Sequence, residues 1–345
     1  MKRILFAIAV IVVLSVPVCA DEFTAPEPPQ AAEALLPVER KSVLEDLMSI
    51  AGKAVEGVAP EVFKAAKLCG SLLVIVLLVS VLDSVTEMPN ALVLCAYVGI
   101  STLLMRTAGT MITLAAQTIR SLSDYGKLLL PVMTGALAAQ GGSTASAGLH
   151  MLTVVFDSLL ASAVSVVLVP VLYLYLALSI AGGAAGQPSL TKLADLAKWL
   201  ATWLLKGILY AFTGFMSVTG VVTGSTDAAI VKATKLSISG MVPVVGGILS
   251  DASESVIAGA AIVKNAAGVY GLLAVLAIWI SPFLQIGIQY LLLKATAALS
   301  ESFGIKRCSE LIGRFASAMG LLLGMTATVC FLLLISTVCF MKGGI

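Results

Sequence analysis

Polar side chains recur at helical spacing within residues 91–120, a segment that is otherwise apolar. This stripe consists of Thr102, Arg106, Thr110, Thr113, Gln117 and Arg120. Steps of three and four residues put these side chains on one face of an α-helix. A charge at mid-membrane costs about 2.5–3.5 kcal/mol, so each such residue is a candidate functional group. The face either lines water or packs inside a helix bundle, and the spacing is compatible with both.

We expect Arg106 at the point of this stripe that lies deepest in the membrane, where a cation needs an acidic partner. Asp157 lies inside a later apolar segment, and we predict that it pairs with Arg106. A second stripe at helical spacing contains Thr202, Lys206 and Thr213. These residues either line a polar interior or belong to a helix in the membrane interface, whose lysines extend toward water.

Two short apolar segments, Leu128–Gln140 and Ile238–Leu249, are each about a dozen residues long, whereas a membrane span needs roughly 20. Proline and glycine interrupt both of them. The interrupting residues are Pro131 and Gly135 in the first segment and Pro243, Gly246 and Gly247 in the second. We therefore predict that both are broken or re-entrant segments, which must be shielded from lipid or line water.

The two short segments occupy matching places in the chain. Pro131 and Pro243 are 112 residues apart, and the central prolines of the long apolar segments that follow them keep the same offset. We therefore predict an internal duplication, with membrane repeats at residues 128–222 and 238–341. Short segments interrupted by proline and glycine in both halves are typical of a membrane binding or conduction site.

Asp251 and Glu254 follow the second short segment and are one helical turn apart, and we expect them at an aqueous mouth. Paired carboxyl groups can act as acid and base, but no base or nucleophile is recognisable beside them, which favours a solvated helix face. The chain has one histidine, which excludes a His-Glu-x-x-His zinc motif, and no glycine-rich loop precedes a Walker lysine. The sequence predicts no enzyme, no cofactor and no metal site.

The composition indicates a helical protein embedded in membrane lipid. Hydrophobic residues make up 59% of the 345 residues, and charged residues make up 12%. Soluble domains have about 25% charged residues. The mean hydropathy is +1.06. The net charge of +2 does not favour nucleic acid as a partner.

Six apolar segments are long enough to span a bilayer. They are residues 68–85, 91–119, 149–180, 199–222, 267–293 and 316–340. With the two short segments, the expected fold is an all-α polytopic membrane protein of six to eight spans. Residues 68–120 are expected to form an N-terminal transmembrane hairpin that precedes the two repeats.

The N-terminus has the features of a secretory signal peptide. Lys2 and Arg3 precede an apolar stretch that ends near Val18, and Ala20 completes a small-residue cleavage site. We expect residues 1–20 to be removed, with a lipid-anchored Cys19 as the alternative. Residues 21–67 are expected to form an extracytoplasmic linker and an amphipathic helix.

Residues Ser225–Gly271 resemble the signature region of the stage III sporulation protein AE family. The resemblance depends on four short motifs. They are Lys232-Ala-Thr-Lys235, Pro243-Val-Val-Gly246, Leu249-Ser-Asp251 and Lys264-Asn265-Ala-x-Gly268. A signal sequence, a short extracytoplasmic head and a repeated membrane core extend the resemblance more loosely over the whole chain.

This resemblance implies a membrane subunit of the channel, or feeding-tube, apparatus between mother cell and forespore, located in the mother-cell membrane around the forespore. It implies other stage III sporulation A-group proteins as partners, and the stage II protein Q of the forespore membrane as an indirect one. Homo-oligomers are also compatible with it. A stand-alone secondary transporter and a structural scaffold for partner proteins are the alternative functions.

Overall fold

The computed structural model describes residues 26–37, 43–83, 89–139, 145–218 and 266–342, which form helices joined by turns, with no strand among them. The expected all-α membrane fold is confirmed. The elements are α2 (Gln30–Glu33), α3 (Val43–Asp83), α4 (Pro89–Ala139), α5 (Ala145–Ala163), the π-helical turn η1 (Val164–Leu168), α6 (Val169–Ala185), α7 (Pro188–Val218), α10 (Ala266–Ser302) and α11 (Lys306–Lys342).

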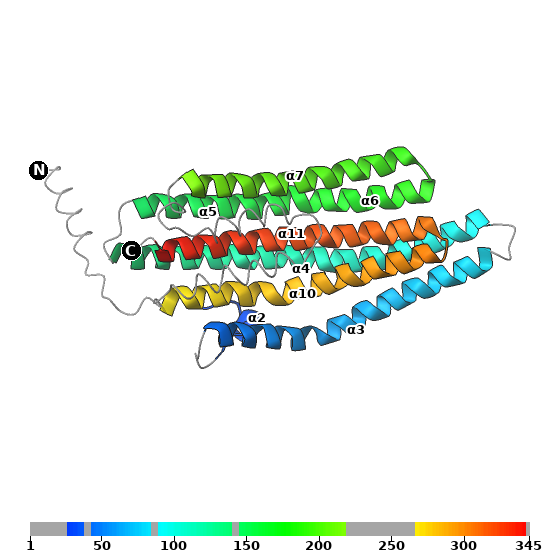
Figure 1. Cartoon of the computed structure of the whole chain (residues 1–345). Coiled ribbons are helices and arrows are strands. Elements are labelled where there is room, and N and C mark those ends of the chain that lie inside the picture. The colour runs from blue at the N-terminus through cyan, green and yellow to red at the C-terminus, as the bar shows by residue number, and fades with distance from the viewer. Residues whose placement is uncertain (1–25, 38–42, 84–88, 140–144, 219–265, 343–345) are drawn as a thin grey trace, which may run out of the picture.

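The long helices run side by side and alternate in direction (Figure 1). Helices α3 and α4 form one antiparallel hairpin, α5–α6 and α7 form a second, and α10 and α11 form a third. The connections within the three hairpins lie at the same end of the bundle. Helix α7 ends and helix α10 begins at the opposite end (Figure 1). The number of spans, six to eight, stays a prediction.

Helices α10 and α11 form the centre of the described bundle. Helix α11 contacts α10 and α4 as well as α5, α6 and α7, and α10 contacts α3. Side chains such as Phe315, Leu322 and Leu332 on α11 are completely buried. A helix that is apolar on all sides belongs inside a bundle, which agrees with the largely apolar sequences of α10 and α11 away from their connecting turn.

Glycines let the outer helices approach this centre closely. A β-carbon at Gly126 of α4 would lie 2.5 Å from Leu333 Cδ2 of α11, and one at Gly271 of α10 would lie 2.6 Å from Leu129 Cδ1 of α4. Small residues at helix contacts are a main source of affinity between membrane helices, because lipid and leucine are equally apolar. The fit at these two glycines therefore fixes how α4 lies against the central hairpin.

Glycine also ends the helices at two of the turns. Gly186 follows α6 with a φ of 64°, and Gly304 lies between α10 and α11 with a φ of 85°. This left-handed conformation favours glycine, which has no β-carbon. Both residues lie at the end of the bundle where the hairpins turn (Figure 1).

The prediction of a separate broken segment at residues 128–140 is wrong. Pro131 lies inside α4, which continues without interruption to Ala139 and includes Gly135. Proline removes one backbone hydrogen bond and is tolerated in membrane helices where neighbouring helices pack closely. Leu129, Leu130 and Met133 are buried beside it, so tertiary packing holds this part of α4 in place.

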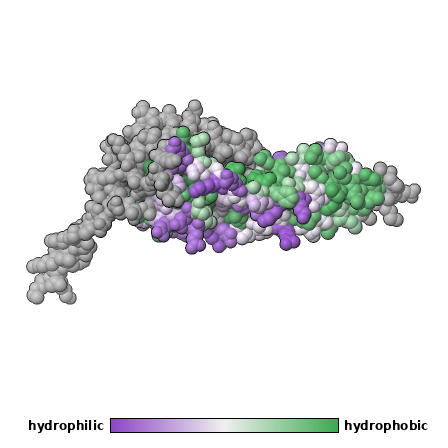
Figure 2. Space-filling model, turned by 90° about the horizontal axis from the view of Figure 1, so that it is seen from below, coloured by the Kyte–Doolittle hydropathy of each residue, from purple (hydrophilic) through white to green (hydrophobic). Residues whose placement is uncertain are grey.

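The boundary predicted near residue 67 is also absent. The amphipathic segment and the first apolar segment form one helix, α3, which contains Pro60. Five helices of the described chain are long and apolar enough to cross a membrane, and α7 is not one of them. Figure 2 shows hydrophilic residues along one part of the bundle and mostly hydrophobic residues toward the end where the hairpins turn.

The predicted duplication can be followed only in part. Each half contains a long helical segment with an internal proline, Pro170 or Pro282, followed by a second long helix, α7 or α11. The first element of the second half, with Pro243 and the residues up to Glu254, lies outside the described residues. The duplication stays a prediction.

The hairpin arrangement predicts the sidedness of three exposed positions. Cysteine replacing Gln187 or Glu301, beside two of the turns, should react with a membrane-impermeant maleimide from the same side of the membrane. Cysteine replacing Met48, near the other end of the bundle, should react from the opposite side. Labelling of intact cells and of inverted vesicles measures this. Reaction of Gln187 and Glu301 variants from different sides would contradict the arrangement.

Candidate functional site

The polar stripe lies on the outer surface of α4. Arg106, Thr110, Thr113 and Gln117 are all exposed, whereas Ala115 between them is buried. We call the set Thr102, Arg106, Thr110, Thr113, Gln117 and Arg120 the α4 stripe. Of the two expected environments, packing inside the described bundle is therefore not observed, and lining of water stays a prediction. The stripe was correctly predicted as one helical face, but that face points away from α10 and α11.

The threonines of the stripe are satisfied within their own helix. The hydroxyl of Thr110 donates to the carbonyl oxygen of Arg106 at 3.2 Å, and that of Thr113 donates to the carbonyl oxygen of Gly109 at 2.9 Å. The guanidinium groups of Arg106 and Arg120 have no hydrogen-bond or ion-pair partner among the described residues. The two arginines are therefore charged groups of this face that require water or a partner molecule.

The predicted pair between Arg106 and Asp157 does not form. Asp157 lies on α5 next to Ser123 and Gly126 of α4. Ser123 is 17 residues from Arg106 along the same helix, which is about 26 Å at 1.5 Å per residue. The prediction failed because it assumed that Asp157 and Arg106 lie at the same depth, whereas α5 meets α4 near the other end of α4.

Asp157 is instead a buried carboxyl group of its own. It is 1% exposed, and neither carboxylate oxygen has a hydrogen-bond partner among the described residues. Its Oδ2 atom lies 3.6 Å from the place that a β-carbon would take at Gly126. Ser123 lies beside it, but the Ser123 hydroxyl is buried without a partner of hydrogen-bonding geometry. A buried ionisable group inside a membrane bundle is a functional candidate by default.

The second predicted stripe follows α7. Thr202 is partly buried, and its hydroxyl donates to the carbonyl oxygen of Lys198 at 2.8 Å. Lys206 is partly exposed on the same helix. Thr213 also belongs to α7, but its side chain lies outside what the structure describes. The described side chains of this stripe thus lie at the edge of the bundle and form no polar interior.

An ion pair that the sequence analysis missed joins α7 to α11. Arg314 Nη1 donates to Asp195 Oδ1 at 2.8 Å. The carbonyl oxygen of Arg314 also accepts a hydrogen bond from the Tyr175 hydroxyl of α6 at 3.1 Å. The partners are 119 residues apart, so no local spacing could predict them. Because the Asp195 side chain is 59% exposed, the pair contributes little stability and mainly aligns the helices.

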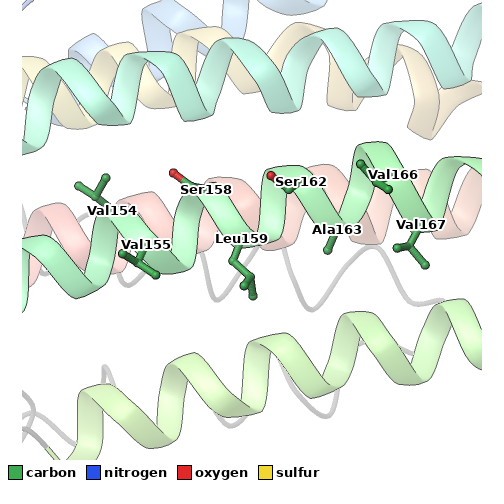
Figure 3. Close-up of a pocket in the computed structure, with 8 residues that line it drawn as sticks. All are labelled: Val154, Val155, Ser158, Leu159, Ser162, Ala163, Val166 and Val167. Carbon is green, nitrogen blue, oxygen red and sulfur yellow. The ribbon is translucent and has the colours of Figure 1, made fainter.

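An apolar groove of about 580 Å³ runs along α5 and η1, and Figure 3 shows the side chains that line it. Its lining consists of Val154, Val155, Ser158, Leu159, Ser162, Ala163, Val166 and Val167. The π-helical turn lies at one end, just before Pro170, which lacks the N–H that an α-helix would bond to Val166. Two serine hydroxyls are its only polar side-chain groups, so the groove offers no acid, base or metal ligand.

The other predicted site residues cannot be placed. Pro243, Gly246, Gly247, Asp251 and Glu254 lie outside the described residues. Among the described residues, no three histidine, cysteine, aspartate or glutamate side chains come together as a metal site would require. The described part of the site is therefore the α4 stripe and the buried carboxyl of Asp157.

The buried carboxyl of Asp157 predicts an effect on stability. Asp157→Val should raise the free energy of unfolding by about 1–3 kcal/mol, because it removes a polar group that is buried without a partner. Asp195→Val, which breaks the ion pair with Arg314, should lower it by at most about 1 kcal/mol. Thermal unfolding of the purified chain in detergent measures both. A loss of stability in Asp157→Val would mean that a partner elsewhere in the chain holds this carboxyl group.

The family model of stage III sporulation protein AE matches residues 33–344. The stage III sporulation protein AE of Bacillus subtilis (strain 168) is 23% identical over 266 residues, which cover 74% of this chain and 66% of the relative. The chain thus spans slightly less than two thirds of that relative's length. No solved structure matches it. Because the family match extends over nearly the whole chain, this multi-pass membrane protein with a role in sporulation belongs to the stage III sporulation protein AE family.

Proposed function

We propose that this chain is a membrane subunit of a sporulation-specific channel complex, a secretion-like feeding tube between mother cell and forespore. In this proposal it resides in the mother-cell membrane around the forespore, enters that membrane with a cleaved signal peptide, and supports late forespore development. Family membership gives the sporulation context. The structural observation that carries the proposal is the outward position of the α4 stripe.

The α4 stripe fits a subunit better than a protein that works alone. Arg106 and Arg120 are 14 residues apart on one face, which is about 21 Å of helix. Lipid chains offer these cations no partner. Helix α5 and the turn η1, by contrast, expose Val155, Leu159 and Val166, which suit lipid or another apolar surface. A bundle with one polar and one apolar outer helix is suited to contact other subunits or a shared water path on its α4 side.

The partners in this proposal are other stage III sporulation A-group proteins and, indirectly, the stage II protein Q of the forespore membrane. A stand-alone transporter would instead need a polar path through one chain. The centre of the described bundle is filled by apolar side chains of α10 and α11, which does not favour that alternative. A scaffold would not depend on the polar character of the α4 stripe.

Cysteine accessibility tests whether the α4 stripe faces water. In a chain without native cysteines, cysteine at Thr113 should react with a membrane-impermeant maleimide. Cysteine at Ala115, which is 1% exposed, should not react because α4 packs there against its neighbours. Cysteine at Val155 is the matched control, since it is 49% exposed on apolar α5. Equal labelling at Thr113 and Val155 would contradict a special environment for the stripe.

Charge removal tests whether the stripe binds partners. In the double variant Arg106→Leu, Arg120→Leu, the amount of A-group proteins that co-purify with the chain from sporulating cells should fall at least about tenfold. The reason is that a desolvated charge pair between subunits contributes about 1.5 kcal/mol or more to binding. Spore yield should fall with it. Arg307→Gln, an exposed cation at the α10–α11 turn, is the control and should change neither.

The outcomes separate the candidate functions. Unchanged co-purification and spore yield in the double variant, with normal protein level, would overturn the channel-subunit proposal in favour of a scaffold. Solute binding by the purified chain alone would favour the transporter.

A further inference from the structure

Basic side chains gather where α7, α10 and α11 approach the turns of their hairpins. Residues 188–198 of α7 and residues 294–314, which join the end of α10 to the start of α11, contain six cations and three acids. The cations are Lys192, Lys198, Lys294, Lys306, Arg307 and Arg314, and the acids are Asp195, Glu301 and Glu310. This end of the three helices therefore has an excess of positive charge.

Three of these cations lie at nearly the same level, one on each helix. Lys198 comes soon after the start of α7, Lys294 shortly before the end of α10, and Arg314 soon after the start of α11. At 1.5 Å per residue, all three lie about 12–15 Å from the helix ends at the turns. Lys198 interacts electrostatically with both Lys294 and Arg314. We call these three residues the basic cluster.

The two lysines of the basic cluster have no counterion of their own. The carboxylate of Asp195 accepts a hydrogen bond from Arg314 at 2.8 Å, and Glu310 also interacts with Arg314. Lys198 and Lys294 form no ion pair with the described residues, and Lys198 is partly buried. Like charges at short range repel each other, most strongly where water is partly excluded. An anion bound between the two lysines would remove this repulsion.

Exposed apolar side chains adjoin the basic cluster on the side away from the turns. Trp199 and Trp203 of α7 are 59% and 60% exposed, and their rings stack with centroids 6.3 Å apart. Leu291 lies about one turn from Lys294 on α10 and is 56% exposed. Exposed tryptophan is typical of the zone where a membrane meets water, because the indole ring is apolar but carries an N–H group. The cations therefore border a surface that suits acyl chains.

We propose that the basic cluster binds the phosphate headgroup of an anionic phospholipid. Lys198 and Lys294 bind the phosphate oxygens from two helices, and the acyl chains lie along Trp203 and Leu291. Lysine ammonium groups are common ligands of phosphate, and basic sites between membrane helices bind anionic headgroups. A zwitterionic lipid has no net charge to offset the two lysines, so it binds less tightly.

The direction of the chain agrees with this site. Short connections rich in lysine and arginine mark the cytoplasmic side of a membrane protein. The far end of the bundle, where α3 begins, is then extracytoplasmic, as expected for residues 21–67 (Figure 1). The lipid site does not rest on the proposed channel function, because it depends on α7, α10 and α11 and leaves the α4 stripe free.

Quenching of tryptophan fluorescence by brominated lipid tests the site. The chain has three tryptophans, and Trp279→Phe removes the buried one, so that Trp199 and Trp203 report on lipid beside the basic cluster. The full chain is placed in mixed micelles with phosphatidylglycerol or phosphatidylcholine that carries brominated acyl chains. The mole fraction for half-maximal quenching should be at least about fivefold lower for phosphatidylglycerol, the factor expected for one cation near an anionic surface. Equal mole fractions for the two lipids would overturn the proposal.

Charge removal checks that the preference comes from the two lysines. In the double variant Lys198→Gln, Lys294→Gln, the mole fractions for the two lipids should agree to within about twofold, because the charges that attract the headgroup are gone. Lys64→Gln removes a lysine on α3 that is 71% exposed, and it should keep the full preference. A folded double variant that still prefers phosphatidylglycerol at least about fivefold would contradict the assignment.

Two further measurements complete the test. Thermal unfolding of the chain with all its tryptophans should show a larger rise of Tm with phosphatidylglycerol than with phosphatidylcholine, because a ligand of the folded state stabilises it. Equal rises would overturn the proposal even if Trp279→Phe does not fold. Soluble glycerol phosphate at millimolar concentration should not displace the brominated phosphatidylglycerol, since it has no acyl chains. Displacement would mean that the site binds a free phosphate ester, and the lipid proposal would be wrong.

Discussion

The bundle depends on the burial of the α10–α11 hairpin, against which every other long helix packs. In a membrane, burial of apolar surface between helices gives no gain over lipid, so the fit of side chains must supply the stability. Gly126 against Leu333 and Gly320 against Tyr290 are such fits, at helix faces that meet α11 from different sides. The apolar sequence of the hairpin leaves the polar residues to the outer helices, which is why the α4 stripe lies outside.

Much of the helical architecture could be predicted from the sequence. Length and hydropathy identified the long apolar segments, and the steps of three and four residues identified the α4 stripe as one face. The end of α4 could not be predicted, because Pro131 was interpreted as an interruption, and the start of α3 was missed because its amphipathic and apolar parts were interpreted as separate segments. Pro60 and Pro131 nevertheless lie inside continuous helices.

The candidate site was predicted less well than the fold. Spacing along one helix gives the face of a residue but not the depth at which a second helix meets it, so Asp157 was paired with the wrong part of α4. The ion pair of Asp195 with Arg314 was missed for the same reason, since it depends on how two hairpins align. Contacts between side chains of different helices can be predicted only from a tertiary structure, whereas a polar stripe along one helix can be predicted from the sequence.

The length of α4 has a mechanical consequence. Its 51 residues extend over about 77 Å, more than twice the roughly 30 Å of a bilayer's hydrocarbon layer. An upright helix of this length leaves more than half of itself outside that layer. The bundle is then a stiff column that stands out of its membrane. In an organelle enclosed by two closely spaced membranes, such a column sets the height at which its outer end can meet whatever approaches from the opposite bilayer.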